Sequence, residues 1–192
     1  TEDLIHQLGA ALQYLHNRPN PVIHGDIKPD NILLDGSGNY FLTDFGISVK
    51  LKQKFTETLR ASSIEESGKG VTPMAYRSPE TFKYKNWEIN ETGPYSDIWS
   101  AGVTVYQVIY DVLPFNGEGG LGQLILMKSG NHPLEDIIEF DDGEFSAFND
   151  VILSALQLYP DKRPNVFGHV PETRKSVTKA PEVATIPVHI PV

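Results

Sequence analysis

Two short apolar runs joined by a five-residue turn most constrain how this chain can fold. The runs are Ile32–Leu34 and Tyr40–Leu42, and the turn between them is DGSGN at residues 35–39. Apolar runs joined by a short glycine-containing turn predict a β-hairpin. A dense polar stretch, HGDIKPDN at residues 24–31, precedes the hairpin, and TDFGIS at residues 43–48 follows it. The hairpin is therefore flanked by two segments whose side chains can carry chemistry.

Helical patterns account for most of the remaining sequence. Apolar residues recur at helical spacing over residues 4–15 and again over residues 145–158, which predicts two amphipathic helices. Residues 95–113 predict a longer, mostly apolar helix, and residues 117–127 a glycine-rich break followed by a short helix. Polar residues interrupt the apolar stretch at 98–115, so this stretch predicts a buried core helix and not a membrane span.

Two segments lack any such periodicity. From Ser48 to Gly70 the chain is rich in Ser, Thr, Glu and Lys, which predicts a mobile loop long enough to carry function. Residues 165–192 carry prolines among isolated valines, and we expect an extended or disordered tail there.

Composition argues against several classes of protein. The 192 residues carry a net charge of −9 and no run of Lys or Arg, which argues against binding to nucleic acid or to an anionic membrane surface. With no cysteine, the chain can form neither a disulfide framework nor a thiolate metal site, and a reducing compartment fits this composition. We therefore expect a cytoplasmic protein, or the cytosolic part of a larger one. Because Thr1 already lies within a helical pattern, we also expect a piece of a longer protein.

Five motifs follow one another in a fixed order. They are HGDIKPDN (24–31), TDFGIS (43–48), YRSPE (76–80), SDIWSAGVTVY (96–106) and DKRP (161–164). In order and spacing they resemble the large, C-terminal lobe of the eukaryotic protein kinase family, of the serine/threonine type, with HGD in place of the more common HRD.

The resemblance covers residues 1–164 and implies a fold of the α+β class, mainly α. It implies a catalytic loop at residues 24–31, an activation segment at residues 44–80 and a small β-hairpin region at the catalytic cleft. No phosphate loop, strand lysine or partner glutamate of the small lobe occurs before residue 24, so we expect this chain to lack the lobe that covers ATP. We therefore expect little activity from the isolated chain and assign catalysis to a parent protein.

The resemblance also implies roles for five residues. Asp26 would accept the proton of the substrate hydroxyl, and Lys28 would steady the transferred phosphate of ATP. Asn31 and Asp44 would hold Mg²⁺ through oxygen atoms, the ligands that this metal prefers. Leu33 would pack beneath the adenine of ATP. Taken one at a time, Asp26 could instead be a helix or turn cap, and Asp44 an ordinary turn residue.

Five further residues would have architectural roles. His24 and Phe45 match apolar positions that hold the catalytic loop against the metal-binding loop. Asp97 resembles a helix-start aspartate that accepts backbone N–H groups from the catalytic loop. Arg163 resembles the partner of Glu80 in a buried ion pair that anchors the activation segment.

The implied reaction moves the γ-phosphoryl group of Mg·ATP to a Ser or Thr hydroxyl of a protein substrate. A lysine two residues after the catalytic aspartate is the pattern of serine/threonine kinases. The alternative is a pseudokinase or scaffold that binds partner proteins without catalysis. The retained polar residues argue against this alternative, because a scaffold has no physical need for metal ligands, whereas the missing small lobe favours it.

The activation segment suggests how activity could be regulated. Its candidate sites for an upstream kinase are Thr56, Thr58, Ser62, Ser63 and Ser67, although flexible loops are also rich in such residues for solubility. Most relatives carry an arginine between the histidine and the aspartate of the catalytic loop, and this arginine clasps a phosphate on the segment. Gly25 cannot make that contact. We therefore expect activity that does not depend on a phosphorylated loop read through this position.

A second glycine pattern, GEGGLG at residues 117–122, matches the spacing of a phosphate loop. It follows a long helix, and only five residues separate Gly122 from Lys128, too few for a strand, a turn and a second strand. We interpret it as a loop between two helices, since a lone match of this kind is weak.

Overall fold

The structure is a computed structural model, and it describes residues 1–46, 48–50, 74–81, 93–115, 138–140, 143 and 145–168. The predicted helix within residues 117–127 lies outside the described residues, as do the five candidate phosphorylation sites.

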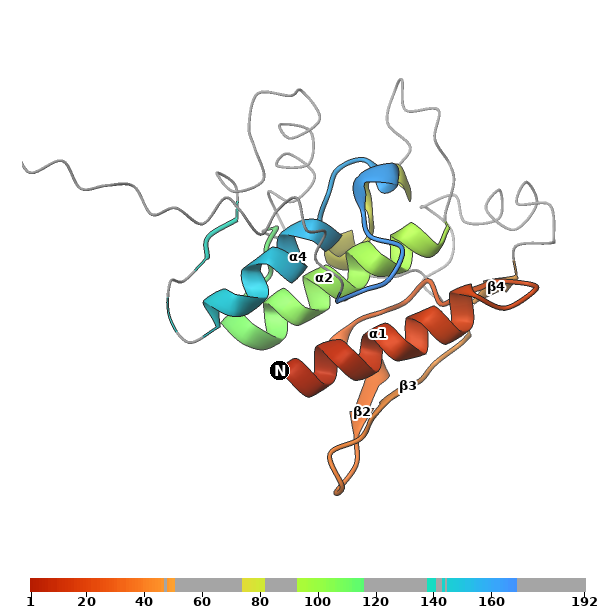
Figure 1. Ribbon diagram of the computed structural model, residues 1–192, viewed down its shortest axis with the longest axis horizontal. Coiled ribbons are helices and arrows are strands. Elements are labelled where there is room, and N and C mark those ends of the chain that lie inside the picture. The colour runs from red at the N-terminus through yellow and green to blue at the C-terminus, as the bar shows by residue number, and fades with distance from the viewer. Residues whose placement is uncertain are drawn as a thin grey trace, which may run out of the picture.

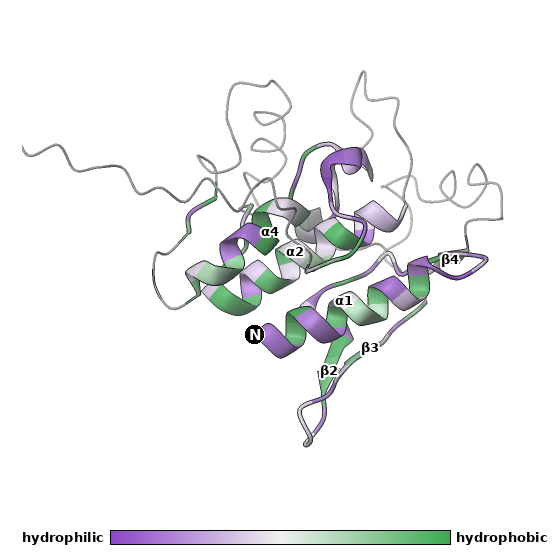
Figure 2. Cartoon of the chain, in the orientation of Figure 1, coloured by the Kyte–Doolittle hydropathy of each residue, from purple (hydrophilic) through white to green (hydrophobic). Residues whose placement is uncertain are grey.

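Three helices form the main packing unit (Figure 1). They are α1 (Glu2–His16), α2 (Pro94–Tyr110) and α4 (Asn149–Ala155). Helix α2 lies between α1 and α4 and contacts both. Its residues from Ser96 to Tyr106 are all buried, which explains why this segment is mostly apolar, and its buried polar side chains include Ser96, Asp97, Ser100 and Thr104. Helix α1 instead alternates hydrophobic and hydrophilic positions, as Figure 2 shows, because only one of its faces packs on α2 and the strands.

The part of the chain that the structure describes also contains two antiparallel strand pairs. Strand β2 (Ile32–Leu34) pairs with β3 (Tyr40–Leu42), with Leu33 opposite Phe41, so the predicted hairpin is confirmed. Strand β1 (Val22–Ile23) pairs with β4 (Val49–Lys50). Short 3₁₀ helices in the described residues are η1 (Pro29–Asn31), η2 (Met74–Tyr76), η3 (Pro79–Thr81), η5 (Ser146–Phe148) and η6 (Pro160–Lys162).

Helix α1 holds the hairpin through one side chain. The Gln7 amide accepts a hydrogen bond from the Tyr40 N–H at 2.9 Å and donates one to the Gly38 carbonyl at 3.2 Å. Tyr40 is the first residue of β3 and Gly38 lies in the turn before it, so one side chain of α1 binds the backbone of both. The hairpin is therefore fixed to α1 at its turn as well as through its apolar side chains.

Three sequence-based boundaries are corrected by the structure. The mobile loop predicted from Ser48 does not begin there, because residues 49 and 50 form β4, and the rest of the predicted loop lies outside the described part. The helix predicted at residues 95–113 ends at Tyr110, where Asp111 adopts a left-handed conformation with φ 57°. The helix predicted at residues 145–158 contains a 3₁₀ turn followed by the shorter α4.

The described structure continues past residue 164, where the sequence predicts a tail. Phe167 is only 3% exposed and belongs to the hydrophobic core. Its backbone passes so close to α1 that a Cβ atom on Gly9 would lie 2.5 Å from the Phe167 carbonyl oxygen. Only a glycine permits this approach. The apolar packing of one aromatic residue thus extends the core beyond the last motif, and residues 169–192 lie outside the described part.

Candidate active site

The first cluster of polar side chains lies in the loop between β1 and β2. Asp26 and Asn31 are 8% and 6% exposed, and the short helix η1 turns the chain so that Asn31 faces back toward Asp26. The Asn31 amide nitrogen donates to the Asp26 carbonyl oxygen at 2.7 Å and to Asp26 Oδ2 at 2.9 Å. Lys28 Nζ donates to the same carboxylate oxygen at 2.8 Å. The structure therefore brings together three of the five predicted site residues.

One oxygen of the Asp26 carboxylate has no partner. Oδ1 is buried and accepts no hydrogen bond from any residue in the described part of the chain, whereas Oδ2 accepts two. Leaving a buried polar atom unpaired costs about 1–3 kcal/mol, and more when the group is charged. Such an atom is suited to accept a hydrogen bond from a ligand, and a hydroxyl group is a donor of the right size and polarity.

Asp97, at the start of α2, binds the backbone of this loop. Asp97 Oδ2 accepts the His24 N–H and Oδ1 accepts the Gly25 N–H, both at 2.9 Å. This confirms the predicted role of Asp97. Gly25 has φ 80°, a left-handed conformation that glycine adopts without steric cost. The glycine therefore suits the backbone conformation of the loop.

His24 joins the loop to the segment after the hairpin. Its Nε2–H donates to the Thr43 carbonyl oxygen at 2.9 Å, and its Nδ1 accepts the Asp26 N–H at 3.2 Å. These two bonds fix the tautomer of a buried, neutral ring. The ring also meets Phe45 edge to face, with centroids 4.7 Å apart. His24 and Phe45 thus make the architectural contact that the sequence predicts.

Asp44 and Leu33 lie at the edge of this cluster. Asp44 follows β3, is exposed, and adopts a left-handed conformation with φ 58°. Its Oδ1 accepts the Gly46 N–H at 3.2 Å, and no hydrogen bond or ion pair joins it to Asp26 or Asn31 within the described ranges. Leu33 is 56% exposed and stands beside Phe41 on an open face of the hairpin. The structure therefore leaves both side chains available to a bound molecule.

The donor set at Asn31 and Asp44 fits Mg²⁺. Both N–H donors of the Asn31 amide are taken by Asp26, so its amide oxygen is the atom left for a cation, and Asp44 supplies a carboxylate. In the described residues, no group of three or more His, Cys, Asp or Glu could hold a metal by itself. Magnesium is usually held by one or two such oxygen ligands together with substrate phosphates, so a pair of protein ligands is sufficient.

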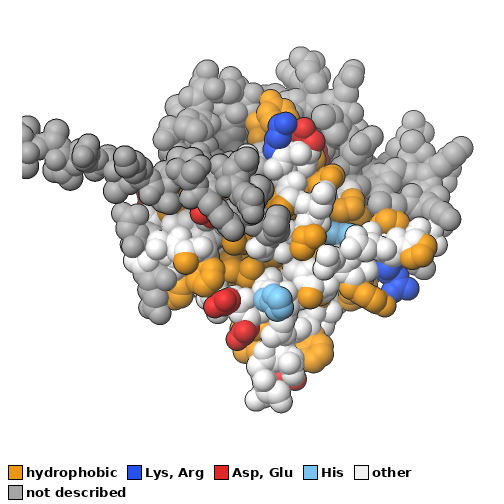
Figure 3. Space-filling model, in the orientation of Figure 1, with side chains coloured by type: hydrophobic (Ala, Val, Ile, Leu, Met, Phe, Trp, Pro, Cys, Tyr) orange, Lys and Arg blue, Asp and Glu red, His pale blue; other side chains and the backbone are white. Residues whose placement is uncertain are grey.

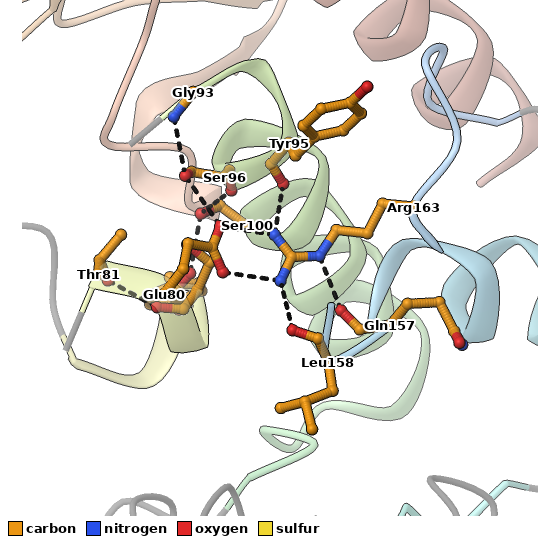
Figure 4. Close-up of polar contacts among 11 residues, drawn as sticks. Glu80, Thr81, Gly93, Tyr95, Ser96, Ser100, Gln157, Leu158 and Arg163 are labelled. Carbon is orange, nitrogen blue, oxygen red and sulfur yellow. Dashed lines mark hydrogen bonds and ion pairs between the residues drawn. The ribbon is translucent and has the colours of Figure 1, made fainter. Parts of the chain in front are cut away.

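A second, separate polar cluster anchors the segment around residues 76–81 (Figure 4). Arg163 donates to both carboxylate oxygens of Glu80, at 2.7 and 2.8 Å, and both side chains are at least 97% buried. The remaining guanidinium hydrogen bonds go to the carbonyl oxygens of Tyr95, Gln157 and Leu158. The predicted ion pair is confirmed.

Burial and pairing with Arg163 shift the pKa of Glu80 in opposite directions. Burial by itself raises the pKa of this carboxyl, but the hydrogen bonds and charge of Arg163 outweigh it and leave the pKa below its ordinary value of 4.5. Glu80 is therefore ionised in the folded protein at neutral pH. The Arg163 guanidinium also lies 5.0 Å from the centre of the Trp99 ring, which adds a cation–π contact.

Two residues of the site were not identified from the sequence. His16 is buried, and its Nε2–H donates to Asp97 Oδ2 at 2.8 Å. His16 lies four residues after Leu12 and so continues the apolar stripe of α1. This position could have indicated a buried side chain. Thr43 precedes Asp44 and contacts Asn31, but nothing in its residue type indicated that contact.

Comparison with known proteins identifies the family. The family model for the protein kinase domain matches residues 1–173. The chain belongs to this family. It is 37% identical over 112 residues to CBL-interacting serine/threonine-protein kinase 16 of Arabidopsis thaliana, an alignment covering 58% of this chain and 23% of that protein. It is 37% identical over 113 residues to NUAK family SNF1-like kinase 2 of Rattus norvegicus, covering 58% of this chain and 15% of that protein.

A longer alignment joins this kinase-family chain to ankyrin repeat and protein kinase domain-containing protein 1 of Homo sapiens. The identity is 28% over 163 residues, covering 84% of this chain and 20% of that protein. The chain spans less than a quarter of the length of each of these three relatives. The family match includes all five motifs and extends past residue 164 to include the buried Phe167.

The surface of the kinase-family chain is consistent with its composition. The face in Figure 3 carries scattered hydrophobic side chains and few Lys or Arg side chains on its described part. Among the described residues, no helix has the length and hydrophobicity needed to cross a bilayer.

Proposed function

We propose that this chain is the large lobe of a serine/threonine protein kinase and carries the residues that orient and deprotonate the substrate hydroxyl. The unpaired, buried Oδ1 of Asp26 is the observation that carries the proposal. A carboxylate whose other oxygen is held by Lys28 and Asn31 presents Oδ1 in one orientation, which a general base requires.

In the proposed reaction, the substrate hydroxyl donates its hydrogen bond to Asp26 Oδ1. The hydroxyl oxygen forms a bond to the γ-phosphorus of ATP, the bond between that phosphorus and the β–γ bridging oxygen breaks, and the hydroxyl proton passes to Asp26. Lys28 lies within 2.8 Å of Asp26 Oδ2 and supplies positive charge beside the transferred group. Bound through Asn31 and Asp44, Mg²⁺ would neutralise charge on the phosphate oxygens.

The nucleotide would lie on the open face of the hairpin. Leu33 and Phe41 present a half-exposed apolar surface at the position where adenine would pack, next to the segment that carries Asp44. We place the lobe that covers ATP in a longer parent protein, and we assign phosphotransfer to that protein. The names of the relatives and the position of Lys28 support Ser and Thr as acceptors. A cytosolic location is consistent with the absence of cysteine.

The regulation that we propose follows from Gly25. Glycine at this position has no side chain to clasp a phosphate, so activity would not require phosphorylation of the activation segment by an upstream kinase. Replacing Thr56, Thr58, Ser62, Ser63 and Ser67 together by Ala in the parent protein should leave phosphotransfer intact. Loss of activity in this variant would refute the proposal.

The main test compares the full-length parent protein with its Asp26→Asn variant in a phosphotransfer assay on protein substrates, followed by identification of the modified residue. We expect phosphoserine or phosphothreonine from the wild type and a rate about 10²–10⁴-fold lower from the variant. No phosphotransfer from the folded wild-type protein would favour the pseudokinase or scaffold alternative.

A further inference from the structure

Thr43 uses its N–H, its hydroxyl and its carbonyl oxygen to join the catalytic loop (residues 24–31) to the segment that carries Asp44. Its N–H donates to the Asn31 carbonyl oxygen at 2.9 Å, and its Oγ1 hydroxyl donates to the same oxygen at 3.2 Å. Its own carbonyl oxygen accepts the His24 Nε2–H at 2.9 Å.

These contacts link the two residues that supply the oxygen ligands. Asn31 directly precedes β2, and Asp44 directly follows Thr43, so the Thr43–Asn31 bonds close the open end of the hairpin. The Asn31 side chain is in turn bonded to Asp26. The position of Asp44 relative to Asn31 therefore depends on the pair of bonds made by Thr43.

The conformation of Asp44 is supported on both sides. Its φ of 58° lies in the left-handed region, which residues other than glycine adopt rarely, although aspartate adopts it more often than most. Asp44 Oδ1 accepts the Gly46 N–H at 3.2 Å, which supports this conformation on the side that follows Asp44. On the side that precedes it, Thr43 is bonded to Asn31 and His24.

We propose that Thr43 is a positioning residue. Its hydroxyl fixes where Asn31 and Asp44 lie relative to each other, so that both can bind Mg²⁺. This inference rests on the proposed function. Magnesium requires near-ideal octahedral geometry with short bonds, so a small displacement of one ligand weakens binding. Loss of a hydrogen bond that orients a metal ligand typically costs about 10–100-fold in metal affinity.

The test uses two substitutions that separate the hydroxyl from the shape of the side chain. Thr43→Val replaces the hydroxyl with a methyl group and keeps both backbone hydrogen bonds, whereas Thr43→Ser keeps the hydroxyl and removes the methyl group. Binding of Mn²⁺ together with a non-hydrolysable ATP analogue is measured by electron paramagnetic resonance in the full-length parent protein. We expect Mn²⁺ affinity to fall about 10-fold in Thr43→Val and to stay near the wild-type value in Thr43→Ser. The unfolding transition of each metal-free variant shows whether the fold is kept.

An Asp44→Asn variant distinguishes this inference from the proposed function. If wild type and Asp44→Asn bind Mn²⁺ equally, the proposed metal site is wrong. If Asp44→Asn weakens binding while Thr43→Val binds as tightly as wild type, only the role of Thr43 is refuted. Equal losses in Thr43→Val and Thr43→Ser would also refute it, because the hydroxyl would then not be the cause. Should Thr43→Val lose its fold, Thr43→Ala takes its place in the same comparison.

Discussion

Two polar clusters in this kinase-family chain contain buried charges, and they differ in how completely those charges are paired. Arg163 and Glu80 make hydrogen bonds through every nitrogen of the guanidinium and both oxygens of the carboxylate. Asp26 is paired through Oδ2 alone, and its Oδ1 has no partner among the described residues. The polar atoms of the Arg163–Glu80 pair all have partners within the described residues, whereas Asp26 Oδ1 would gain a partner only from a ligand.

We propose that this difference separates a structural role for the Arg163–Glu80 pair from a catalytic role for Asp26. A buried ion pair with all of its hydrogen bonds made contributes little beyond what an apolar pair would, yet losing one partner is costly because the other charge remains buried. An unpaired carboxylate oxygen destabilises the fold and is retained where it has a chemical use. Substitutions in the anchor should therefore change stability, and substitutions in the catalytic loop should change phosphotransfer.

The largest effect on stability is expected for Arg163→Ala. Glu80 would be left buried without its partner, and the free energy of unfolding should fall by about 3–5 kcal/mol. Chemical denaturation of the metal-free protein measures this change. Lys162→Ala is the matched control, because Lys162 pairs with Asp161 at the exposed surface, where such pairs contribute about 0–1 kcal/mol. An unchanged unfolding midpoint for Arg163→Ala would refute the anchor.

For Lys28→Met we expect a large effect on the phosphotransfer rate and a smaller loss of stability than for Arg163→Ala, because Asn31 still donates to the Asp26 carboxylate. The substitution removes the positive charge beside the transferred phosphoryl group and keeps most of the side-chain volume. We expect kcat of the full-length parent protein to fall about 10²–10³-fold. Steady-state phosphotransfer and an unfolding curve on the same preparations measure both quantities. Loss of stability equal to that of Arg163→Ala would show that the two clusters do not differ in role.

The anchor also predicts a dependence of stability on pH. The pKa of Glu80 is lower in the folded protein than its ordinary value of 4.5, so its contribution is fully present above pH 4.5 and is lost as the pH falls through the folded value. The stability difference between wild type and Glu80→Gln should therefore shrink as the pH is lowered from 6 to 3. Urea unfolding at a series of pH values measures it, and a constant difference would contradict the assignment.

The smallest expected effect on stability comes from two aspartates with the same unusual backbone conformation. Asp44 and Asp111 have φ values of 58° and 57°. Asp111 ends α2, away from the catalytic loop, so Asp111→Gly should raise the free energy of unfolding by about 1 kcal/mol without loss of phosphotransfer. Asp44→Gly should relieve similar strain but abolish phosphotransfer. Equal activity in the two glycine variants would contradict the role of Asp44.

Short sequence patterns predicted those elements whose stabilising contacts lie within a few residues of one another. The DGSGN turn between two apolar runs was sufficient to predict the β2–β3 hairpin, because the Asp35 side chain accepts the backbone N–H groups of Ser37 and Asn39 within the turn. The Glu80–Arg163 pair joins residues far apart in sequence, and it was predicted from the family resemblance and not from spacing.

Other features depend on contacts that a sequence pattern does not reveal. The helix predicted at residues 145–158 is shorter than expected, and beyond α4 the Gln157 and Leu158 carbonyl oxygens accept hydrogen bonds from Arg163. His16 bonds to Asp97, which lies 81 residues away in the sequence. The left-handed backbone of Asp44 occurs together with a hydrogen bond from the Gly46 N–H to its side chain, which the sequence alone does not reveal.

The most direct test of the central claim measures the phosphotransfer rate and the free energy of unfolding of Asp26→Asn on one preparation of the full-length parent protein. The account predicts a phosphotransfer rate about 10²–10⁴-fold below wild type. It also predicts a free energy of unfolding within about 1 kcal/mol of wild type, because the amide keeps the shape of the side chain and its oxygen can still accept the hydrogen bonds from Lys28 and Asn31. Phosphotransfer at the wild-type rate would contradict the claim that Asp26 is the catalytic base.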